Sequence, residues 1–350
     1  MDPLHRHPHA DFFVELKLLH ESAAALGYRM PAEWEPLAAV WLSLPHNETT
    51  WPGCLAQAQA QHANFAAELR RFVDVHIVGV DIDLITDDAW IRDYGPIFVK
   101  DASGALACHD FHFNNWGGKY GACGHDDVVP QYVARRLGVP LWVHDFVLEG
   151  GSIEVNGAGT VMTSESCLLG PGRNPGLSRV DIEAALHAFL GTRHAIWLPA
   201  GIEGDDTDGH IDDLARFVGP SMVAAVRAPE GHPDFAVLER NWEVLGAARD
   251  QDGRRIERVA LPMPEPRRWY FPPEDDWAGG ERMVPASYAN FLIANGGVLV
   301  PTFAQPSDDA ALRLFEGLFP GREVVGVPAE FLVVGLGSLH CLSQQQPAAG

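Results

Sequence analysis

The chain has 350 residues, 47% of them hydrophobic and 21% charged, which is ordinary for a globular protein with a large core. Its 25 basic and 47 acidic residues give a formal net charge of −22, and a surface of that sign repels nucleic acid and anionic membranes. Because no apolar run has the length of a membrane span and the N-terminus lacks a signal-peptide core, we expect a cytoplasmic protein without nucleic-acid or membrane partners.

The first expected element is an N-terminal helix over residues 12–26. After it, one pattern occurs five times: an apolar strand leads into a loop rich in Pro, Gly or Asn, a helix follows, and a second apolar strand comes after the helix. In chain order, the expected helices are 55–72, 126–137, 178–190, 234–247 and 307–318. The strands expected after them are 75–80, 141–147, 195–198, 256–261 and 323–327. The strands expected before them include 39–44, 160–163, 222–227 and 298–303.

These helices recur roughly every 50–70 residues, a spacing that indicates a ring or an array of supersecondary units. The units are not alike in sequence, so an ordinary α/β domain with alternating elements is the alternative. No linker interrupts the chain, and the proline-rich stretch 262–273 is expected to be a long loop. We therefore expect one domain over residues 1–350, with residues 1–28 as a tail and added helix.

The cysteines argue against a disulfide framework, because none forms a CxxC pair and an odd number leaves one unpaired. They are Cys54, Cys108, Cys123, Cys167 and Cys341. Cys341 differs from the others because Gly335 and Gly337 precede it and let the backbone turn tightly, so that a substrate can approach the main chain. A buried structural cysteine is the alternative for this thiol.

Unusual polar residues gather in the segments that follow four of the post-helix strands, which are residues 87–96, 148–152, 204–213 and 335–346. If the units form a ring, these segments converge on one end of its axis. That arrangement would bring carboxylates, a histidine and a thiol into one site. The side chains concerned are Asp93, Glu149, His210, Asp212 and Cys341.

Each polar residue also has an ordinary interpretation. Asp93 is expected to pair locally with Arg92 if it has no function, and Glu149 to be a solvated turn residue. His210 and Asp212 are two residues apart and would face the same side of a strand, toward either a ligand or solvent.

Taken together, these side chains suit a guanidinium substrate. Several carboxylates around one thiol oppose thiolate formation and repel one another. A planar guanidinium carries N–H donors that match carboxylates in pairs. Its positive charge offsets both the repulsion among the carboxylates and their effect on the thiol. Trp90 and Trp116 lie in or near the same segments and are expected to line the path of a cation through cation–π contact.

A metal site is the sharpest alternative, with His109, Asp110 and His112 as one candidate cluster and His210 with Asp212 as another. No HExxH or CxxC motif accompanies them, and on a strand His109 and Asp110 would face opposite sides. No dinucleotide-binding or Walker motif is present. We therefore expect neither a metal nor an organic cofactor.

The motif segments resemble the agmatine deiminase family, which also contains the bacterial peptidyl-arginine deiminases. The match runs along nearly the whole chain and is carried by residues 30–36, 51–53, 90–96, 115–120, 148–152, 207–212, and 340–341 with Gln344 and Gln345. The resemblance implies the pentein fold of the guanidine-modifying superfamily, a five-bladed pseudo-symmetric α/β propeller.

The resemblance also implies roles for the site residues. Cys341 would be the nucleophile and His210 the general acid and base, while Asp93 and Asp212 would hold the guanidinium. Glu149 would orient His210 or the substrate. Trp90, Trp116 and Gly337 complete the set that we expect to contact the substrate.

The implied reaction is the hydrolysis of agmatine to N-carbamoylputrescine and ammonia through a covalent thiouronium intermediate, in polyamine biosynthesis, by a possible homo-oligomer. Peptidyl-arginine or free arginine is the alternative substrate, and a non-catalytic guanidine-binding or polyamine-binding protein is the alternative class. Four features depart from the family pattern: Leu336 interrupts the glycines before the thiol, Tyr94 replaces a smaller residue, Asp208 replaces an asparagine, and the segment 121–125 is short.

Overall fold

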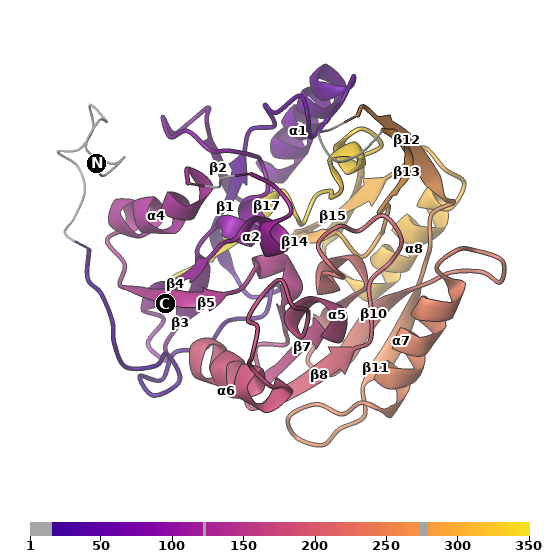
Figure 1. Ribbon diagram of the computed structural model, residues 1–350. Helices are drawn as coiled ribbons and strands as arrows, with labels where there is room; N and C mark the ends of the chain where they lie inside the picture. The colour runs from indigo at the N-terminus through magenta and orange to yellow at the C-terminus, as the bar shows by residue number, and fades with distance from the viewer. Residues whose placement is uncertain (1–15, 122–123, 274–278) are drawn as a thin grey trace.

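Five three-stranded sheets with the same internal order make up most of the computed structural model, which describes residues 16–121, 124–273 and 279–350. In each sheet the middle strand pairs antiparallel with one neighbour and parallel with the other. A helix follows the middle strand before the chain returns as the parallel neighbour. Figure 1 shows these helices around the outside of the molecule. The repeated unit predicted from the sequence is confirmed.

The elements of the five units are as follows. The middle strands are β1 (Leu37–Ser43), β4 (Leu106–His112), β7 (Thr160–Ser164), β10 (Met222–Arg227) and β15 (Gly297–Thr302). The helices after them are α1 (Leu55–Leu69), α4 (Val129–Leu137), α6 (Arg179–Leu190), α7 (Phe235–Ala247) and α8 (Asp308–Leu318). The parallel neighbours are β2 (Asp74–Val78), β5 (Leu141–Val147), β8 (His194–Leu198), β11 (Glu257–Pro262) and β16 (Glu323–Pro328). The antiparallel neighbours are β17 (Ser343–Pro347), β3 (Ile97–Lys100), β6 (Glu154–Val155), β9 (Ala215–Gly219) and β14 (Leu292–Ala294).

Short elements connect these strands and carry much of the site described below. They are the helices α2 (Ile91–Tyr94), α3 (Asn115–Gly118) and α5 (Glu165–Leu168), and the 3-10 turns η3 (Asp126–Val128), η4 (Gly150–Ser152), η5 (Ile211–Asp213) and η6 (Leu332–Gly335). A separate hairpin joins β12 (Arg267–Phe271) to β13 (Gly280–Val284).

Local sequence signals fix the ends of the helices. Ser178 accepts a hydrogen bond from the backbone N–H of Asp181 through its side chain, and the Asp181 carboxylate accepts one in return from the Ser178 backbone, so α6 begins at a capping box. The same helix ends at Gly191 and α4 ends at Gly138, with φ of 65° and 66°. Glycine adopts this left-handed conformation without a Cβ penalty, so both helices stop where the sequence predicts.

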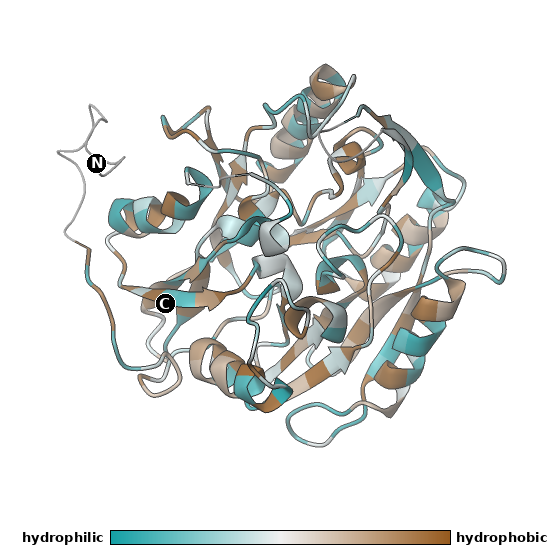
Figure 2. Ribbon diagram, in the orientation of Figure 1, coloured by the Kyte–Doolittle hydropathy of each residue, from teal (hydrophilic) through white to brown (hydrophobic). Residues whose placement is uncertain are grey.

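The units contact one another in sequence and then return to the start. The first touches the second through β17 and β3, the third touches the fourth through β6 and β9, and the fourth touches the fifth through β11 and α8. The imidazole of His109 on β4 hydrogen-bonds the carbonyl of Phe189 on α6, which links the second to the third. The fifth unit meets the first where β16 packs on α1. Figure 2 shows apolar strands inside these units and mixed helix surfaces outside.

Strand β17 comes from the far end of the chain and completes the first sheet. It pairs antiparallel with β1, with Gln344 opposite Trp41. The indole N–H of Trp41 also donates to Oε1 of Gln346 at 3.0 Å. This pairing holds Cys341, two residues before β17, against α2, where the backbone N–H of Arg92 donates to the Cys341 carbonyl at 3.3 Å.

Two sequence expectations about the fold are wrong. Residues 16–26 are not helical, because the backbone of Lys17 and Leu19 pairs with Leu141 at the otherwise open edge of β5. A series of turns follows. The rest of the expected helix, residues 12–15, lies outside the described residues. The stretch 262–273 is only partly a loop, since it contains β12, whose backbone pairs with β13. Within the described parts of the chain, none of the helices has the length and apolar character needed to span a membrane.

Candidate active site

A cavity of about 350 Å³ opens beside Cys341. Cys341 and Asp93 lie in its wall together with the rings of Trp90 and Trp116. The other residues that line it are Asn47, Thr49, Thr50, Asp87, Asp88, Asn115, Tyr120, Gly121, Asp126, Asp206, Thr207, Phe271, Arg282, Gly335 and Leu336. Its polar walls come from several of the repeated units, as expected if the loops of those units meet at one place.

Asn290 positions the thiol of Cys341. Its side-chain N–H donates to Sγ at 3.0 Å, and its Oδ1 accepts the backbone N–H groups of His340 at 2.9 Å and Cys341 at 3.2 Å. Burial raises the pKa of the thiol well above its ordinary value, and the neighbouring carboxylates of Asp212 and Asp213 raise it further. The thiol is therefore protonated while the cavity is empty.

The glycines before Cys341 are required by close packing. A Cβ on Gly337 would lie 2.7 Å from the Trp90 ring and 3.2 Å from Sγ of Cys341, and a Cβ on Gly335 would lie 2.6 Å from the Trp51 ring. Leu336, between them, has a φ of 73°, in the left-handed region that favours glycine. The two glycines were predicted to let the backbone turn, but neither has a positive φ: packing requires them, and Leu336 adopts the left-handed conformation.

Asp93 lies on α2 with both carboxylate oxygens occupied. Oδ2 accepts the indole N–H of Trp116 at 2.9 Å, and Oδ1 accepts the backbone N–H of Gly151 at 3.0 Å. Burial raises the pKa of Asp93 well above its ordinary value, and the nearby Asp212 and Glu149 raise it further. The alternative of a local ion pair fails, because Arg92 is directed away from Asp93 and donates to the carbonyl of His340 at 3.2 Å.

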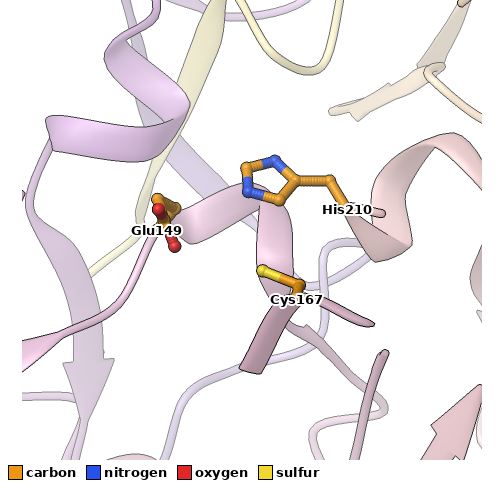
Figure 3. A group of neighbouring side chains, drawn as sticks. All are labelled: Glu149, Cys167 and His210. Atoms are coloured by element: carbon orange, nitrogen blue, oxygen red, sulfur yellow. The ribbon is translucent and has the colours of Figure 1, made fainter. Parts of the chain in front are cut away.

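Glu149 and His210 face each other, with Cys167 beside them (Figure 3). One ligand-type atom from each of the three lies within 4.8 Å of the others, and all three are buried. Nε of Arg173 forms an ion pair with Oε1 of Glu149 at 2.7 Å, so the alternative of a solvated turn residue fails for this glutamate. The arginine charge there also opposes a metal cation.

The imidazole of His210 is neutral and has no hydrogen-bond partner among the described residues. Burial lowers its pKa to about 3, against a smaller opposite effect of Asp212. Its Nδ1 lies 3.7 Å from Oδ1 of Asp93. A Cβ on Gly151 would come within 2.5 Å of the same nitrogen, so the second glycine after Glu149 makes room for the ring. A buried, unpartnered imidazole is costly for the fold and typical of a group that acts on protons.

Asp212 stands between the thiol and a second histidine. Its Oδ2 contacts Nδ1 of His340 at 2.7 Å and accepts from Sγ of Cys341 at 3.5 Å, while its Oδ1 has no hydrogen-bond partner among the described residues. Burial raises the pKa of Asp212, but the hydrogen bond and the charge of His340 outweigh burial and leave it below the ordinary value. His210 caps the start of the 3-10 turn η5 and Asp212 lies within it, so the two do not share a strand and that sequence expectation is wrong.

The structure gathers the eight predicted site residues at or beside the cavity, and their roles stay proposals. Trp90 stacks on Trp51 at a centroid distance of 5.4 Å and walls the cavity. The other predicted cluster is not part of it: His109 contacts His144 at 2.9 Å, Asp110 accepts from Gln131 at 2.9 Å, and neither lines the cavity. As predicted for a strand, they face different neighbours.

Several residues at the site were missed by sequence reasoning. Asn290 and Cys167 hold no motif that marks them, and Arg173 was not singled out. Glu33 was noted only as part of the segment 30–36, yet its Oε1 lies 2.6 Å from Nε2 of His340. Buried charge partners such as these come from distant parts of the chain, so only the folded structure brings them together.

The comparisons with known proteins agree with this geometry. The chain is 39% identical over 345 residues to a putative agmatine deiminase of Streptomyces coelicolor, covering 91% of this chain and 99% of the relative. It is 38% identical to the agmatine deiminase of Stutzerimonas stutzeri, covering 92% and 96%. The solved structure of the agmatine deiminase of Enterococcus faecalis matches with a TM-score of 0.89 at 32% identity, covering 95% of this chain and 99% of that one.

The family model for the Porphyromonas-type peptidyl-arginine deiminases matches residues 29–347, which include every site residue named above. That range spans all five units of the fold. The chain therefore belongs to the Porphyromonas-type peptidyl-arginine deiminase family, together with the agmatine deiminases.

Proposed function

We propose that this protein is an agmatine deiminase, a hydrolase that converts agmatine and water into N-carbamoylputrescine and ammonia. The observation that carries the proposal is that the Cys341 thiol lines one cavity together with the carboxylate of Asp93 and also contacts the carboxylate of Asp212 at 3.5 Å. The curated relatives named as agmatine deiminases, which match almost the whole chain, support the same activity.

The carboxylates bind the guanidinium and set its orientation. Oδ1 of Asp212 lacks a hydrogen-bond donor among the described residues, whereas Glu149 is ion-paired with Arg173. A buried acceptor without a donor is costly, and the N–H groups of a bound guanidinium would remove that cost. Asp93 adds a second carboxylate, which the substrate charge would keep ionised.

The first half of the reaction forms the covalent intermediate. Binding of a cation next to Asp93 and Asp212 offsets the negative charge that raises the thiol pKa, so Cys341 can lose its proton to His210. The thiolate attacks the guanidinium carbon and a C–S bond forms. His210 then returns the proton to the departing nitrogen, the C–N bond breaks, and ammonia leaves a thiouronium on Cys341.

The second half uses the same histidine in reverse. His210 takes a proton from a water molecule, which attacks the thiouronium carbon. The C–S bond breaks, His210 gives its proton to the leaving sulfur and so restores the Cys341 thiol, and the second proton of the water passes from the ureido oxygen to solvent as the product leaves. No redox step is involved, and the atoms of one water molecule are divided between product and ammonia. Fixing the thiol and the carboxylates in place supplies up to about 7–11 kcal/mol in favourable cases of this kind.

The charge of the cavity lining favours agmatine over arginine. The cavity lining contains five aspartates and one arginine. Among them, Asp88 accepts hydrogen bonds from Thr50 at 2.5 Å and Asn47 at 3.3 Å. Burial raises the pKa of Asp126 to about 8, so this carboxyl also gains by facing a cation. A terminal ammonium suits such a wall, whereas the carboxylate of free arginine is repelled by it.

The same family placement supports the finer points of fold and setting. We infer that the five three-stranded sheets are the blades of a five-bladed propeller, because they share one strand order and contact one another in a closed series. A cytoplasmic enzyme of putrescine biosynthesis, assembled as a homo-oligomer, is what the family resemblance suggests.

The test is a substrate panel. The purified protein is incubated with agmatine, free arginine and an arginyl peptide, and ammonia and ureido product are measured. We expect product from agmatine at a kcat/KM well above that for the other two. Product from the peptide alone would move the assignment to a peptidyl-arginine deiminase. Binding of agmatine by calorimetry with no ammonia release would indicate a non-catalytic binding protein, and chelator-sensitive turnover would favour a metal hydrolase.

A further inference from the structure

A buried chain of three side chains lies behind the candidate nucleophile. Nδ1 of His340 is 2.7 Å from Oδ2 of Asp212, and Nε2 of the same ring is 2.6 Å from Oε1 of Glu33. The three residues come from η5, from the turn before β17 and from the loop before β1. Asp212 and His340 are at most 1% exposed and Glu33 is 8% exposed, so water does not compete for these contacts.

Other charged groups surround the histidine from every packed element. Arg216 on β9 is ion-paired with Glu33 and, at 2.8 Å, with Glu154 on β6. Arg92 on α2 lies 3.8 Å from Glu33. The thiol of Cys341, next in sequence, is a further titratable neighbour and contacts Asp212 at 3.5 Å.

The number of protons shared by Glu33, His340 and Asp212 follows from the hydrogen bonds among them. A carboxylate that has lost its proton only accepts hydrogen bonds, so each short contact to the ring needs an N–H on that ring nitrogen. A neutral imidazole has one N–H and an imidazolium has two. Burial raises the pKa of Glu33, but Arg216 and His340 outweigh burial and hold it well below the ordinary value, so this acid is ionised.

The groups around His340 shift the pKa of its ring in opposite directions. Burial lowers the pKa of His340 and the charges of Arg216 and Arg92 lower it further, whereas Glu33 and Asp212 raise it by less, so that these effects together lower the pKa. The contact geometry decides between them, because two ionised carboxylates at 2.7 and 2.6 Å from the ring can both be satisfied only by a ring with two N–H groups.

We propose that His340 is a buried imidazolium held between Glu33 and Asp212, and that it positions Asp212 as an ionised acceptor for the substrate guanidinium. The hydrogen bond from Nδ1 fixes the rear oxygen, Oδ2. The front oxygen, Oδ1, is buried and has no donor among the described residues. The role of Asp212 toward substrate rests on the proposed function, whereas the charge of His340 does not.

This arrangement answers an electrostatic problem of the site. Asp93, Asp212 and Asp213 are all buried near the thiol, and burial raises the pKa of Asp93 and of Asp213. A carboxylate at that place tends to take up a proton and so lose its attraction for a cation. A fixed positive charge behind Asp212 keeps this one carboxylate ionised before the substrate arrives.

The charge state can be tested without any substrate. Protein with nitrogen-15-labelled histidine is observed by NMR at about pH 8.5, where histidines of ordinary pKa near 6.5 are neutral. We expect one ring with both nitrogens protonated to persist at that pH. The variant His340→Asn should remove this signal, and Glu33→Gln should convert it to a neutral ring. Absence of a persistent doubly protonated ring in the unaltered protein overturns the proposal.

Kinetics separate positioning from a merely structural role. In Glu33→Gln a neutral amide replaces the carboxylate, so we expect the ring to lose its charge and the pKa of Asp212 to rise. We expect kcat/KM for agmatine to fall roughly 10- to 100-fold, as for loss of a charged hydrogen bond. The acid limb of its pH profile should move up by about one unit, since Asp212 must be ionised.

A matched variant provides the control. Glu154→Gln removes a carboxyl group that pairs with the same Arg216 but makes no hydrogen bond to His340. It should shift the acid limb less than Glu33→Gln. Equal shifts of the acid limb in the two variants would mean that the shift reflects only the total charge of the core. That result would overturn the positioning role of His340. If agmatine proves not to be a substrate, the NMR result still decides whether His340 is charged.

Discussion

Asn290 and Cys341 are joined by two hydrogen bonds, one from the amide N–H of Asn290 to Sγ at 3.0 Å and one from the Cys341 backbone to Oδ1 at 3.2 Å. Asn290 therefore fixes both the sulfur and the turn that carries it. A donor at this distance also favours the thiolate, since a hydrogen bond to the charged form stabilises it.

Asn290→Ala should reduce kcat for agmatine by roughly 10- to 100-fold, because a hydrogen bond to a charged group is worth about 1.5–3 kcal/mol. The rate of Cys341 alkylation by iodoacetamide at fixed pH should fall in parallel. Asn290→Asp is the matched variant: it keeps the acceptor but removes the donor and adds a negative charge, so alkylation should be slower still. An alkylation rate equal to that of the unaltered protein in both variants would contradict this role.

Cys341→Ala should abolish turnover while the protein stays folded. The change removes one sulfur atom beside a cavity, so the free energy of unfolding should change by no more than about 1 kcal/mol. Thermal unfolding and ammonia release are the two measurements. Cys167→Ala is the comparison, since it removes a buried thiol that does not line the cavity. Ammonia release by Cys341→Ala at a normal rate would exclude this cysteine as the nucleophile.

Asp93→Asn should lower kcat/KM by roughly 10- to 100-fold, because one charged contact with the guanidinium becomes neutral. The same substitution should raise the free energy of unfolding or leave it nearly unchanged. Burial already raises the pKa of Asp93, so an uncharged side chain is easier to bury there. Asp252→Asn, at an exposed ion pair with Arg193, serves as the surface control. An unchanged kcat/KM would argue against contact with the substrate.

Gly337→Ala should cost activity, whereas Leu336→Gly should preserve it. The added methyl of the first would lie 2.7 Å from the Trp90 ring and 3.2 Å from Sγ of Cys341, so the thiol must move. The second relieves a left-handed φ of 73° that costs roughly 1–2 kcal/mol for a residue with a Cβ. Gly317→Ala, where a Cβ meets open space, is the control. Equal kcat/KM values for Gly337→Ala and this control would refute the steric argument.

Buried His210 should make the fold sensitive to acid. Its pKa of about 3 in the folded protein lies below the ordinary value of 6.5, so the unfolded chain binds the proton first. Its contribution to stability is complete above about pH 6.5 and is lost as the pH falls toward 3, at about 1.4 kcal/mol per pH unit. His210→Asn should show a shallower decline in denaturant-measured stability over that window; parallel declines would disprove it.

Much of the fold could be predicted because its helices carry local signals. The helix predicted over 178–190 forms as α6 with Ser178 as its cap, and the helix over 307–318 forms as α8 with Ser307 as its cap. The antiparallel strands were not predicted. β6 has two residues and β14 three, and their pairing is set by partners elsewhere in the sheet and not by their own periodicity.

The N-terminal segment shows why a local pattern can mislead. Its apolar residues suit a helix, but Leu19 and Lys17 find backbone partners on Leu141 that a helix would forgo. At the site, motif residues such as Asp93 and His210 could be found from the sequence. Asn290 could not, since it lies 51 positions from Cys341 and nothing local marks it.

The place of β17 in the first sheet has a consequence for biosynthesis. Strand β1 emerges from the ribosome early, but its antiparallel partner, Ser343–Pro347, is made some 300 residues later. Cys341, the proposed nucleophile, lies just before that partner and is therefore also made late. If Cys341 has that role, the chain gains its catalytic sulfur and completes its first sheet within the same short stretch of translation.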